Sequence, residues 1–303
     1  MHVFFVRNMT ISYPIPDTFY QYLSIIRETK KSLSFVINLK IIILLILDQW
    51  KFGNGFLILG KQKNIMKTIL HTAESRGHAD HGWLNSYHSF SFANYHNPER
   101  MNFGVLRVLN DDTVSGGQGF GQHPHKNMEI ISIPLKGDLE HKDSMGNTTV
   151  IKEGDVQVMS AGTGVFHSEF NKNKNEEVKF LQIWVFPKTQ NITPRYDQIS
   201  TRDLATKNSL YQILSPEKTE QGVWIHQDAW FFLGDFETEN TSTYTLNKTG
   251  NGLYIFVLEG EVAIGDQALK RRDGMGIWDT DQIELTATAP SKVLLMEVPM
   301  AQI

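Results

Sequence analysis

Short runs of alternating hydrophobic and polar residues follow one another along most of the chain. "FGVLRVLNDD" (103–112), "EIISIPLKG" (129–137) and "EVKFLQIWVFP" (177–187) each have the length of a β-strand and each end in residues that favour a turn. Successive side chains of a strand point to opposite faces, so this alternation is typical of strands that bury one face. Several such strands at close spacing, without helices between them, predict an antiparallel sandwich or barrel.

A weak internal repeat divides this β-rich part in two. Residues 130–159 run from a strand through a Lys-Gly turn and a hairpin to a Glu-Gly-Asp turn and another strand, and residues 254–279 follow the same order. The turn glycines are 17 residues apart in the first copy (Gly137, Gly154) and 14 apart in the second (Gly260, Gly274). The repeat predicts two similar β-domains, with the proline-containing stretch 187–196 as the crossing. We expect one helix or turn, within 201–214.

Residues 1–65, called the leader below, differ from the rest in composition. They carry eight Lys and Arg against three Asp and Glu, a net charge of +5, which leaves −9 for the remainder of a chain whose total is −4. "LSFVINLKIIILLIL" (33–47) looks like a membrane segment, but its uninterrupted apolar core covers only 41–47, against the roughly 20 residues needed to cross a bilayer. No small-residue cleavage site follows it, as a signal peptide requires. We expect the leader not to belong to the fold, with Met66 as the true start; a membrane-proximal anchor is the alternative.

The overall composition narrows the function classes. With 303 residues, 41% of them hydrophobic and 20% charged, the chain can form one large domain or two small ones. Its net charge of −4 gives no reason to expect direct nucleic-acid binding. The absence of cysteine excludes disulfides, thiolate zinc sites and cysteine nucleophiles, and we expect a cytoplasmic protein. Any metal must be held by His, Asp, Glu or carbonyl oxygen.

Four residues in two short motifs have the spacing of metal ligands on strands. His123 and His125 are one residue apart in "GQHPHKNMEI" (121–130), and His167 and Glu169 repeat that spacing in "FHSE" (166–169). Side chains at i and i+2 of a strand face the same way, so each pair shares a face. On neighbouring strands of a small barrel, three imidazoles and a carboxylate would surround one point, which suits a first-row divalent ion. Four protein ligands leave two positions open on an octahedral ion, so the site would be catalytic.

Other residues compete with these or support them. Glu129 has the same parity as the first two histidines and competes for the carboxylate role, although Pro124 weakens the parity argument. His141 lies in a predicted hairpin beside the site, where it either supports a ligand or is exposed. His226 is the only histidine after His167, so we expect a metal in the first half alone. The remaining histidines of the β-rich part are interpreted as polar loop residues: His71, His78, His81, His88 and His96.

Aromatic and glycine-rich segments suggest a pocket. The glycine-rich "SGGQGFG" (115–121) is not followed by a helix, so it is interpreted as a turn or pocket rim rather than a phosphate loop. The aromatic cluster between 83 and 95 either lines an apolar pocket over the metal or plugs the barrel. We expect a planar ligand to be bordered by side chains from these two segments: Trp83, Phe90, Phe92, Tyr95 and Phe120.

Taken together, these motifs resemble the pirin family, and more narrowly its bacterial members described as quercetin 2,3-dioxygenases. The matching stretches are "RGHADHGWLNSYHSFSFANYHNPERMNFGVLRVLNDD", "GQGFGQHPHKNMEI", "EHKDSMGN", "MSAGTGVFHSE", "LQIWVFP" and "ITPRYDQ". The resemblance runs from Met66 to about Val298 and leaves the leader without a counterpart. It implies an all-β bicupin of two tandem antiparallel jelly-roll barrels. Residues 66–190 would form the metal-binding cupin, and residues 191–303 a second cupin without a metal site.

The resemblance also implies a ligand set and an activity. The family's ligands correspond here to His123, His125, His167 and Glu169, which favours Glu169 over Glu129. Because many cupins use a glutamate of the first motif, Glu129 stays an alternative. The implied activity is cleavage of a flavonol such as quercetin by O2 with release of carbon monoxide. Glu169 would serve as ligand and as proton acceptor. We expect Fe(II), with Cu, Ni, Mn, Co or Zn as alternatives.

The expected partners are a small planar aromatic substrate and O2, bound by a monomer. The alternative function is a metal- or redox-sensing regulator that binds a protein partner, because eukaryotic pirins resemble transcriptional cofactors. A metal-free structural or storage bicupin is a third possibility.

Overall fold

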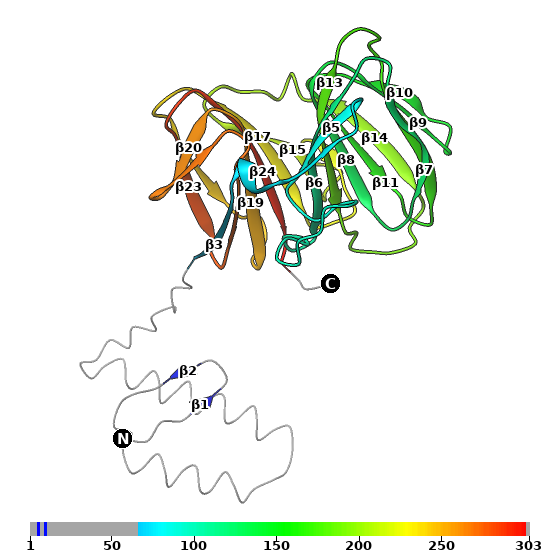
Figure 1. Cartoon of the computed structure of the whole chain (residues 1–303). Helices are drawn as coiled ribbons and strands as arrows, with labels where there is room; N and C mark the ends of the chain where they lie inside the picture. Colours follow the sequence, from blue (N-terminus) through cyan, green and yellow to red (C-terminus); the bar gives the residue numbers. More distant parts are fainter. Residues whose placement is uncertain (1–4, 7–8, 11–65, 301–303) are drawn as a thin grey trace, which may run out of the picture. The chain divides into compact units, whose positions relative to one another are not determined.

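The computed structural model describes residues 5–6, 9–10 and 66–300 (Figure 1). Phe5–Val6 (β1) and Met9–Thr10 (β2) pair in antiparallel fashion within a first compact unit, which covers Met1–Lys63. The apolar run 33–47 lies outside the described residues, so both interpretations of the leader stay predictions. All other strands of the described residues belong to the second unit, Asn64–Ile303.

The first barrel consists of a seven-stranded and a four-stranded antiparallel sheet. The larger sheet has the order β14-β11-β8-β13-β6-β5-β4 and the smaller β10-β9-β12-β7. The larger sheet contains β4 (Gly77–Asp80), β5 (Leu84–His88), β6 (Leu106–Val114), β8 (Glu129–Lys136), β11 (Asp155–Ser160), β13 (Val178–Val185) and β14 (Arg195–Ser200). The smaller contains β7 (Gly119–His125), β9 (Leu139–Asp143), β10 (Thr148–Ile151) and β12 (Val165–Asn171).

The second barrel repeats this plan. Its sheets have the orders β16-β15-β17-β24-β19-β22-β3 and β18-β23-β20-β21, and only the short β15–β16 pairing is parallel. The larger sheet contains β3 (Lys67–His71), β15 (Leu210–Ser215), β16 (Val223–Trp224), β17 (Trp230–Phe236), β19 (Asn251–Glu259), β22 (Gly274–Trp278) and β24 (Ser291–Pro299). The smaller contains β18 (Thr241–Thr245), β20 (Glu261–Ile264), β21 (Gln267–Lys270) and β23 (Gln282–Ala287). The predicted all-β fold of two tandem barrels is confirmed.

The internal repeat corresponds to β8–β11 in the first barrel and β19–β22 in the second. Gly137 and Gly260 occupy the first turn of each copy with φ of 73° and 80°, a conformation that favours glycine. Gly154 turns the chain in the same way before β11, whereas Gly274 is the first residue of β22 itself.

Two strands belong to a different barrel from the one that the predicted domain boundary assigns to them. β3 precedes the first barrel in sequence but pairs with β22 of the second, from Lys67↔Trp278 to His71↔Gly274. β14 follows the first barrel's other strands and pairs with β11, from Asp155↔Ser200 to Ser160↔Arg195. The predicted division at 190/191 therefore does not follow the sheets at these two strands.

The two seven-stranded sheets share one hydrophobic core. Leu106, Ile131 and Ile183 of the first barrel belong to the same buried cluster as Phe256 and Leu294 of the second. The residues that alternate with these along each strand point their side chains into the barrels instead. This shared core makes one face of each large sheet apolar. The side chains on the opposite face determine whether the interior of each barrel is apolar or polar.

The interiors of the two barrels differ. A large apolar cluster that includes Leu253, Ile255 and Leu295 fills the second barrel. The apolar clusters inside the first barrel are smaller, and buried polar side chains such as Ser132 and Gln182 occupy inward positions. The first barrel therefore has the more polar interior, which can hold the polar side chains of a functional site.

Helical structure is minimal. In residues 66–300 it is limited to the 3-10 turn Ala73–Ser75 (η1), and no described helix is long and apolar enough to pass through a membrane. The helix considered within 201–214 does not form. A turn covers 202–204, and Leu210–Ser215 is drawn into β15 by its pairing with β17.

Candidate metal centre

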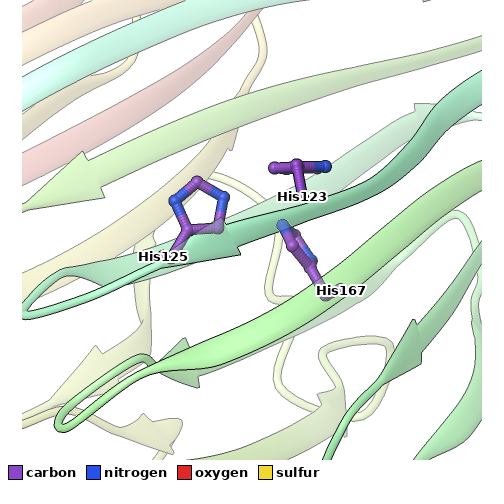
Figure 2. Close-up of side chains that lie close together, drawn as sticks. All are labelled: His123, His125 and His167. Atoms are coloured by element: carbon purple, nitrogen blue, oxygen red, sulfur yellow. The ribbon is translucent and has the colours of Figure 1, made fainter.

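Two paired strands of the first barrel bring three histidines together. β7 and β12 run antiparallel with His123 opposite His167 and His125 opposite Val165. On β12, His167 and Glu169 are buried, while Phe166 before them and Phe170 after them are exposed, as strand alternation requires. Figure 2 shows the three imidazole rings gathered close together beside these two strands.

The distances suit a single metal ion. The ring centroids lie 4.9 Å apart for His123 and His125, 4.4 Å for His123 and His167, and 4.8 Å for His125 and His167. One ligand atom from each lies within 4.8 Å of the other two. Imidazole nitrogens bind ions such as zinc at about 2.0–2.1 Å, so small side-chain rotations can bring these lone pairs to one point.

The protonation states also suit metal binding. The Gly121 carbonyl accepts a 2.8 Å hydrogen bond from Nδ1 of His123, which leaves Nε2 as the free lone pair. Burial lowers the pKa of His125 to about 4, and proximity to His123 contributes. Burial and the neighbouring imidazoles lower the pKa of His167 to about 2. Both ring nitrogens of His167 are buried without a hydrogen-bond partner among the described residues, and coordination through one of them would remove part of this cost.

Glu169 is held in a closed set of hydrogen bonds. Its Oε1 lies 3.0 Å from Oγ of Ser132, its Oε2 accepts a 2.7 Å bond from Nε2 of Gln182, and Oγ of Ser132 also lies 3.0 Å from Oε1 of Gln182. The Ser132 hydroxyl has one proton and cannot donate to both acceptors. A proton on Oε1 of Glu169 satisfies every group, because Glu169 then donates to Ser132. Burial accordingly raises the pKa of Glu169 to about 7, against the opposing effect of these two partners.

A second, inner group lies behind the three histidines. His141 sits opposite Glu169 across the β9–β12 pairing, and ligand atoms of His141, His167 and Glu169 lie within 4.8 Å of one another. Asp143 accepts a 3.0 Å bond from Nε2 of His141 and further bonds from Met145 and Asn147. Nδ1 of His141 is therefore a lone pair, and it has no hydrogen-bond partner in the described part of the chain. His141 is fully buried, not exposed in its hairpin.

Glu129 lies on the other side of its strand. Its Oε2 accepts a 2.7 Å bond from Oγ of Ser160, with the backbone N–H of His226 at 3.4 Å. It shares the parity of Ile131, which belongs to the core between the barrels, and not of Ser132, which contacts Glu169. The parity argument from the sequence fails because the chain leaves the smaller sheet after His125 and enters the larger one at Glu129.

A cavity of about 350 Å³ opens onto the histidines. His123, His125 and Glu169 line it, and so do aromatic side chains on several strands and loops: Trp83, Phe92, Phe120 and Trp184. The ring of Trp184 packs edge-on against two of these neighbours, with its centroid 4.9 Å from that of His125 and 5.3 Å from that of Phe92. The cavity thus offers flat apolar walls beside the metal ligands.

Three of the five aromatic residues predicted for the pocket line the cavity, and two do not. Trp83, Phe92 and Phe120 are at its wall. Phe90 is buried in the core between the barrels, 5.3 Å from the ring of Tyr254. Tyr95 packs over Gly77 and stacks on His88 instead. These two rings come from the predicted segment, but the backbone there directs them away from the cavity.

The glycine-rich segment has a packing role. A Cβ on Gly116 would lie 2.2 Å from the Lys174 carbonyl oxygen, and one on Gly119 would lie 2.3 Å from that of Glu169. Both glycines therefore let β7 and its turn approach the neighbouring backbone. Of 115–121, only Phe120 lines the cavity.

Polar residues of the cavity were missed by the sequence interpretation. His88, taken for a loop residue, is buried in β5, and Ser86, Asn110 and Asp112 line the cavity beside it. Burial raises the pKa of Asp112 to about 7, while its bond from Ser86 opposes this and the charges of Asp111 and Glu169 add to it. The sequence did contain a signal for these residues. Along β5 and β6 they occupy every second position, so their side chains point into the barrel while the residues between them point outward. His71 is also buried and bonds to Tyr254, whereas His78, His81 and His96 are exposed.

Within the described residues, potential metal-ligand groups occur only in the first barrel. The backbone of His226 contacts Glu129, and its ring packs on Trp224 at 4.1 Å.

Comparisons with known proteins agree with this architecture. The sequence model of the Pirin family matches residues 69–185, and that of the quercetinase C-terminal cupin domain matches residues 212–298. A quercetin 2,3-dioxygenase of Escherichia coli (strain K12) is 42% identical over 230 residues, which cover 76% of this chain and 98% of the relative. A pirin-like protein of Caulobacter vibrioides is 36% identical, over 73% of this chain and 95% of its own. The crystal structure of the bacterial pirin YhhW from Escherichia coli in complex with nickel(II) matches with a TM-score of 0.73 and 40% identity, covering 78% of this chain and 100% of YhhW.

Proposed function

Because the chain belongs to the pirin family, we propose that it is a metal-dependent dioxygenase that cleaves a flavonol such as quercetin with O2 and releases carbon monoxide. One observation carries the proposal: three clustered imidazoles lie beside a buried carboxyl group, and His123, His125 and Glu169 of this set line a cavity with aromatic walls. The relatives named quercetin 2,3-dioxygenase support the substrate class.

We assign the metal to His123, His125, His167 and Glu169. The free lone pairs of the histidines and the unpartnered nitrogens of His167 fit this assignment. Nitrogen and carboxylate donors suit a first-row divalent ion, and Fe(II) is our expectation. The nickel(II) complex of YhhW supports an ion of this class. A bound ion would supply Lewis-acid chemistry by acidifying a coordinated hydroxyl and polarising the substrate.

Glu169 is the proposed proton acceptor. Burial gives the Glu169 carboxyl a pKa of about 7 in the metal-free protein, and a bound cation would favour its ionised form, which is the form that accepts a proton as a general base. Uptake at Oε1 completes the hydrogen bonds with Ser132 and Gln182, because Ser132 can turn its hydroxyl from Glu169 to Gln182. These two residues would thus stabilise either protonation state of Glu169.

The cavity would bind and orient the substrate. Its volume of about 350 Å³ falls in the range of roughly 300–1,000 Å³ that is usual for small-molecule sites. Flat rings gain from stacking or edge contacts with aromatic walls in addition to the area they bury. A planar polyphenol therefore suits the space beside His125 and Trp184.

Turnover of quercetin by purified, metal-loaded protein tests the proposal. We expect O2 uptake and carbon monoxide release in equal amounts, and their loss in His125→Ala. His226→Ala is the matched control, because it removes an imidazole outside both groups of potential ligands. Metal-loaded protein that consumes no O2 with quercetin would overturn the proposal and favour a regulatory role.

A further inference from the structure

One wall of the cavity carries four polar residues that the proposed metal ligands do not explain. Ser86 and His88 on β5 face Asp112 and Asn110 on β6 in direct cross-strand pairs. All four line the cavity and none is more than 4% exposed. Burying polar groups is unfavourable unless they are hydrogen-bonded, so four polar residues on the inner wall of a barrel are expected to lower the stability of the fold.

The four residues satisfy part of their hydrogen-bonding capacity among themselves. Ser86 donates to Oδ1 of Asp112, and Nδ1 of His88 lies 2.9 Å from Oδ1 of Asn110. Three polar atoms remain without a hydrogen-bond partner in residues 66–300: Oδ2 of Asp112, Nε2 of His88 and Nδ2 of Asn110. None of the three is among the fully enclosed unpartnered atoms, so each is open to the cavity.

These atoms match the hydrogen-bonding pattern of phenolic hydroxyl groups. The Asn110 carbonyl can only accept, so Nδ1 of His88 carries the proton and Nε2 is an acceptor. A carboxylate oxygen of Asp112 is also an acceptor, while Nδ2 of Asn110 is a donor. A hydroxyl group both donates and accepts, and the wall therefore offers partners for both functions.

The pairing of the strands fixes the distance between this polar wall and the metal ligands. Ser132, Gln182, Asn110 and His88 form one cross-strand row over β8, β13, β6 and β5. Gln182 contacts Glu169, and His88 is two strands further on, roughly 10 Å away at the usual strand spacing. Aromatic side chains, among them Phe92 and Trp184, border the same cavity.

The fold does not require this polarity. In the second barrel, the strands in the same order, β19, β24 and β17, carry Ile255, Leu295 and Phe232 as a cross-strand row, which β15 continues with the half-buried Gln212. The three apolar side chains belong to or pack against the apolar cluster inside that barrel. The polar row thus accompanies the barrel that has the histidines.

We propose that Asp112, with His88 and Asn110, binds hydroxyl groups on the part of the substrate that lies away from its metal-chelating oxygens. The site would then select polyhydroxylated flavonols over flavonols without such hydroxyl groups. This inference rests on the proposed function, because it deepens the substrate class of the same cavity.

The test compares quercetin with 3-hydroxyflavone, which keeps the chelating oxygens and lacks the other hydroxyl groups. At pH 8.5, above the pKa of about 7 to which burial raises Asp112, its carboxylate is charged; Asp112→Asn retains an acceptor for Ser86 and removes that charge. We expect kcat/KM for quercetin to fall roughly tenfold or more and that for 3-hydroxyflavone to change less than about twofold, since a hydrogen bond to a charged group is lost only with quercetin. Asp203→Asn, the same change at an exposed position, is the control and should alter neither value.

Metal content and thermal unfolding of each variant show whether the centre and the fold are kept. Equal loss for both flavonols, or a wild type without preference between them, would overturn the recognition proposal. A wild type that turns over neither flavonol would refute the proposed function instead. Binding titrations of the two flavonols with the same metal-loaded variants would then decide the recognition proposal, by whether Asp112→Asn weakens quercetin alone.

Discussion

Replacing Glu169 with glutamine is expected to stabilise the metal-free protein at neutral and alkaline pH. Glutamine has the shape of protonated glutamic acid, and its Nε2 can donate to Ser132 as the acid proton does. Ser132 then donates to Gln182, whose Nε2 donates to the new amide oxygen. The substitution therefore keeps every hydrogen bond while removing a group that must ionise in a buried place.

The size of the effect follows from the shifted pKa. The pKa of Glu169 rises from 4.5 to about 7 on folding because the group is buried. A raised pKa gives a contribution to stability that is present below about pH 4.5 and is lost as the pH rises through about 7. At about 1.4 kcal/mol per pH unit, the loss amounts to about 3 kcal/mol, most of which accumulates between these two values. Glu169→Gln should escape that loss.

Urea denaturation of the metal-free proteins between pH 4.5 and 8.5 measures the difference. The free energies of unfolding should agree within error near pH 4.5, and the variant should be more stable by about 3 kcal/mol at pH 8.5. Glu284→Gln, at an exposed position of β23, should follow the wild type throughout. A Glu169→Gln protein that is no more stable than the wild type at pH 8.5 would refute the buried, protonated state of Glu169.

Three further outcomes are expected. His125→Ala should lose the metal in elemental analysis, because two imidazoles and a carboxylate bind it weakly, whereas His226→Ala should retain it. Apparent metal affinity, measured by chelator competition, should rise about tenfold per pH unit up to about pH 7 and then level off, because Glu169 must release its proton; Glu169→Gln should lack this slope. Glu297→Ala should destabilise the protein by about 3 kcal/mol or more in urea denaturation with metal content unchanged, since the buried carboxylate accepts bonds from Tyr244, Asn247, Lys248 and Asn251.

The sequence predicted the parts of the site that depend on local geometry. His123 with His125, and His167 with Glu169, share the two-residue period of a strand, which is a property of the backbone alone. That β7 and β12 are neighbours is a long-range fact that spacing does not contain. The resemblance to a family supplied it, and it specified as tandem cupin barrels the two β-domains that the internal repeat predicted.

The features that were missed depend on which strands pair. Glu129 has the parity of the histidines along the chain but belongs to a different sheet. Asp112 and His88 come to one wall through the β5–β6 pairing, and β13 adds Gln182 from about 70 residues further along the chain. Phe90 was misassigned for the same reason, because its neighbours include Tyr254 of the other barrel.

Anomalous diffraction from crystals of the metal-loaded protein, recorded at the absorption edge of the metal, would locate the ion directly. We expect one strong peak in the first barrel, within bonding distance of His123, His125, His167 and Glu169. A peak bound by His141, His167 and Glu169 without His123 and His125, or a peak in the second barrel, would contradict this expectation.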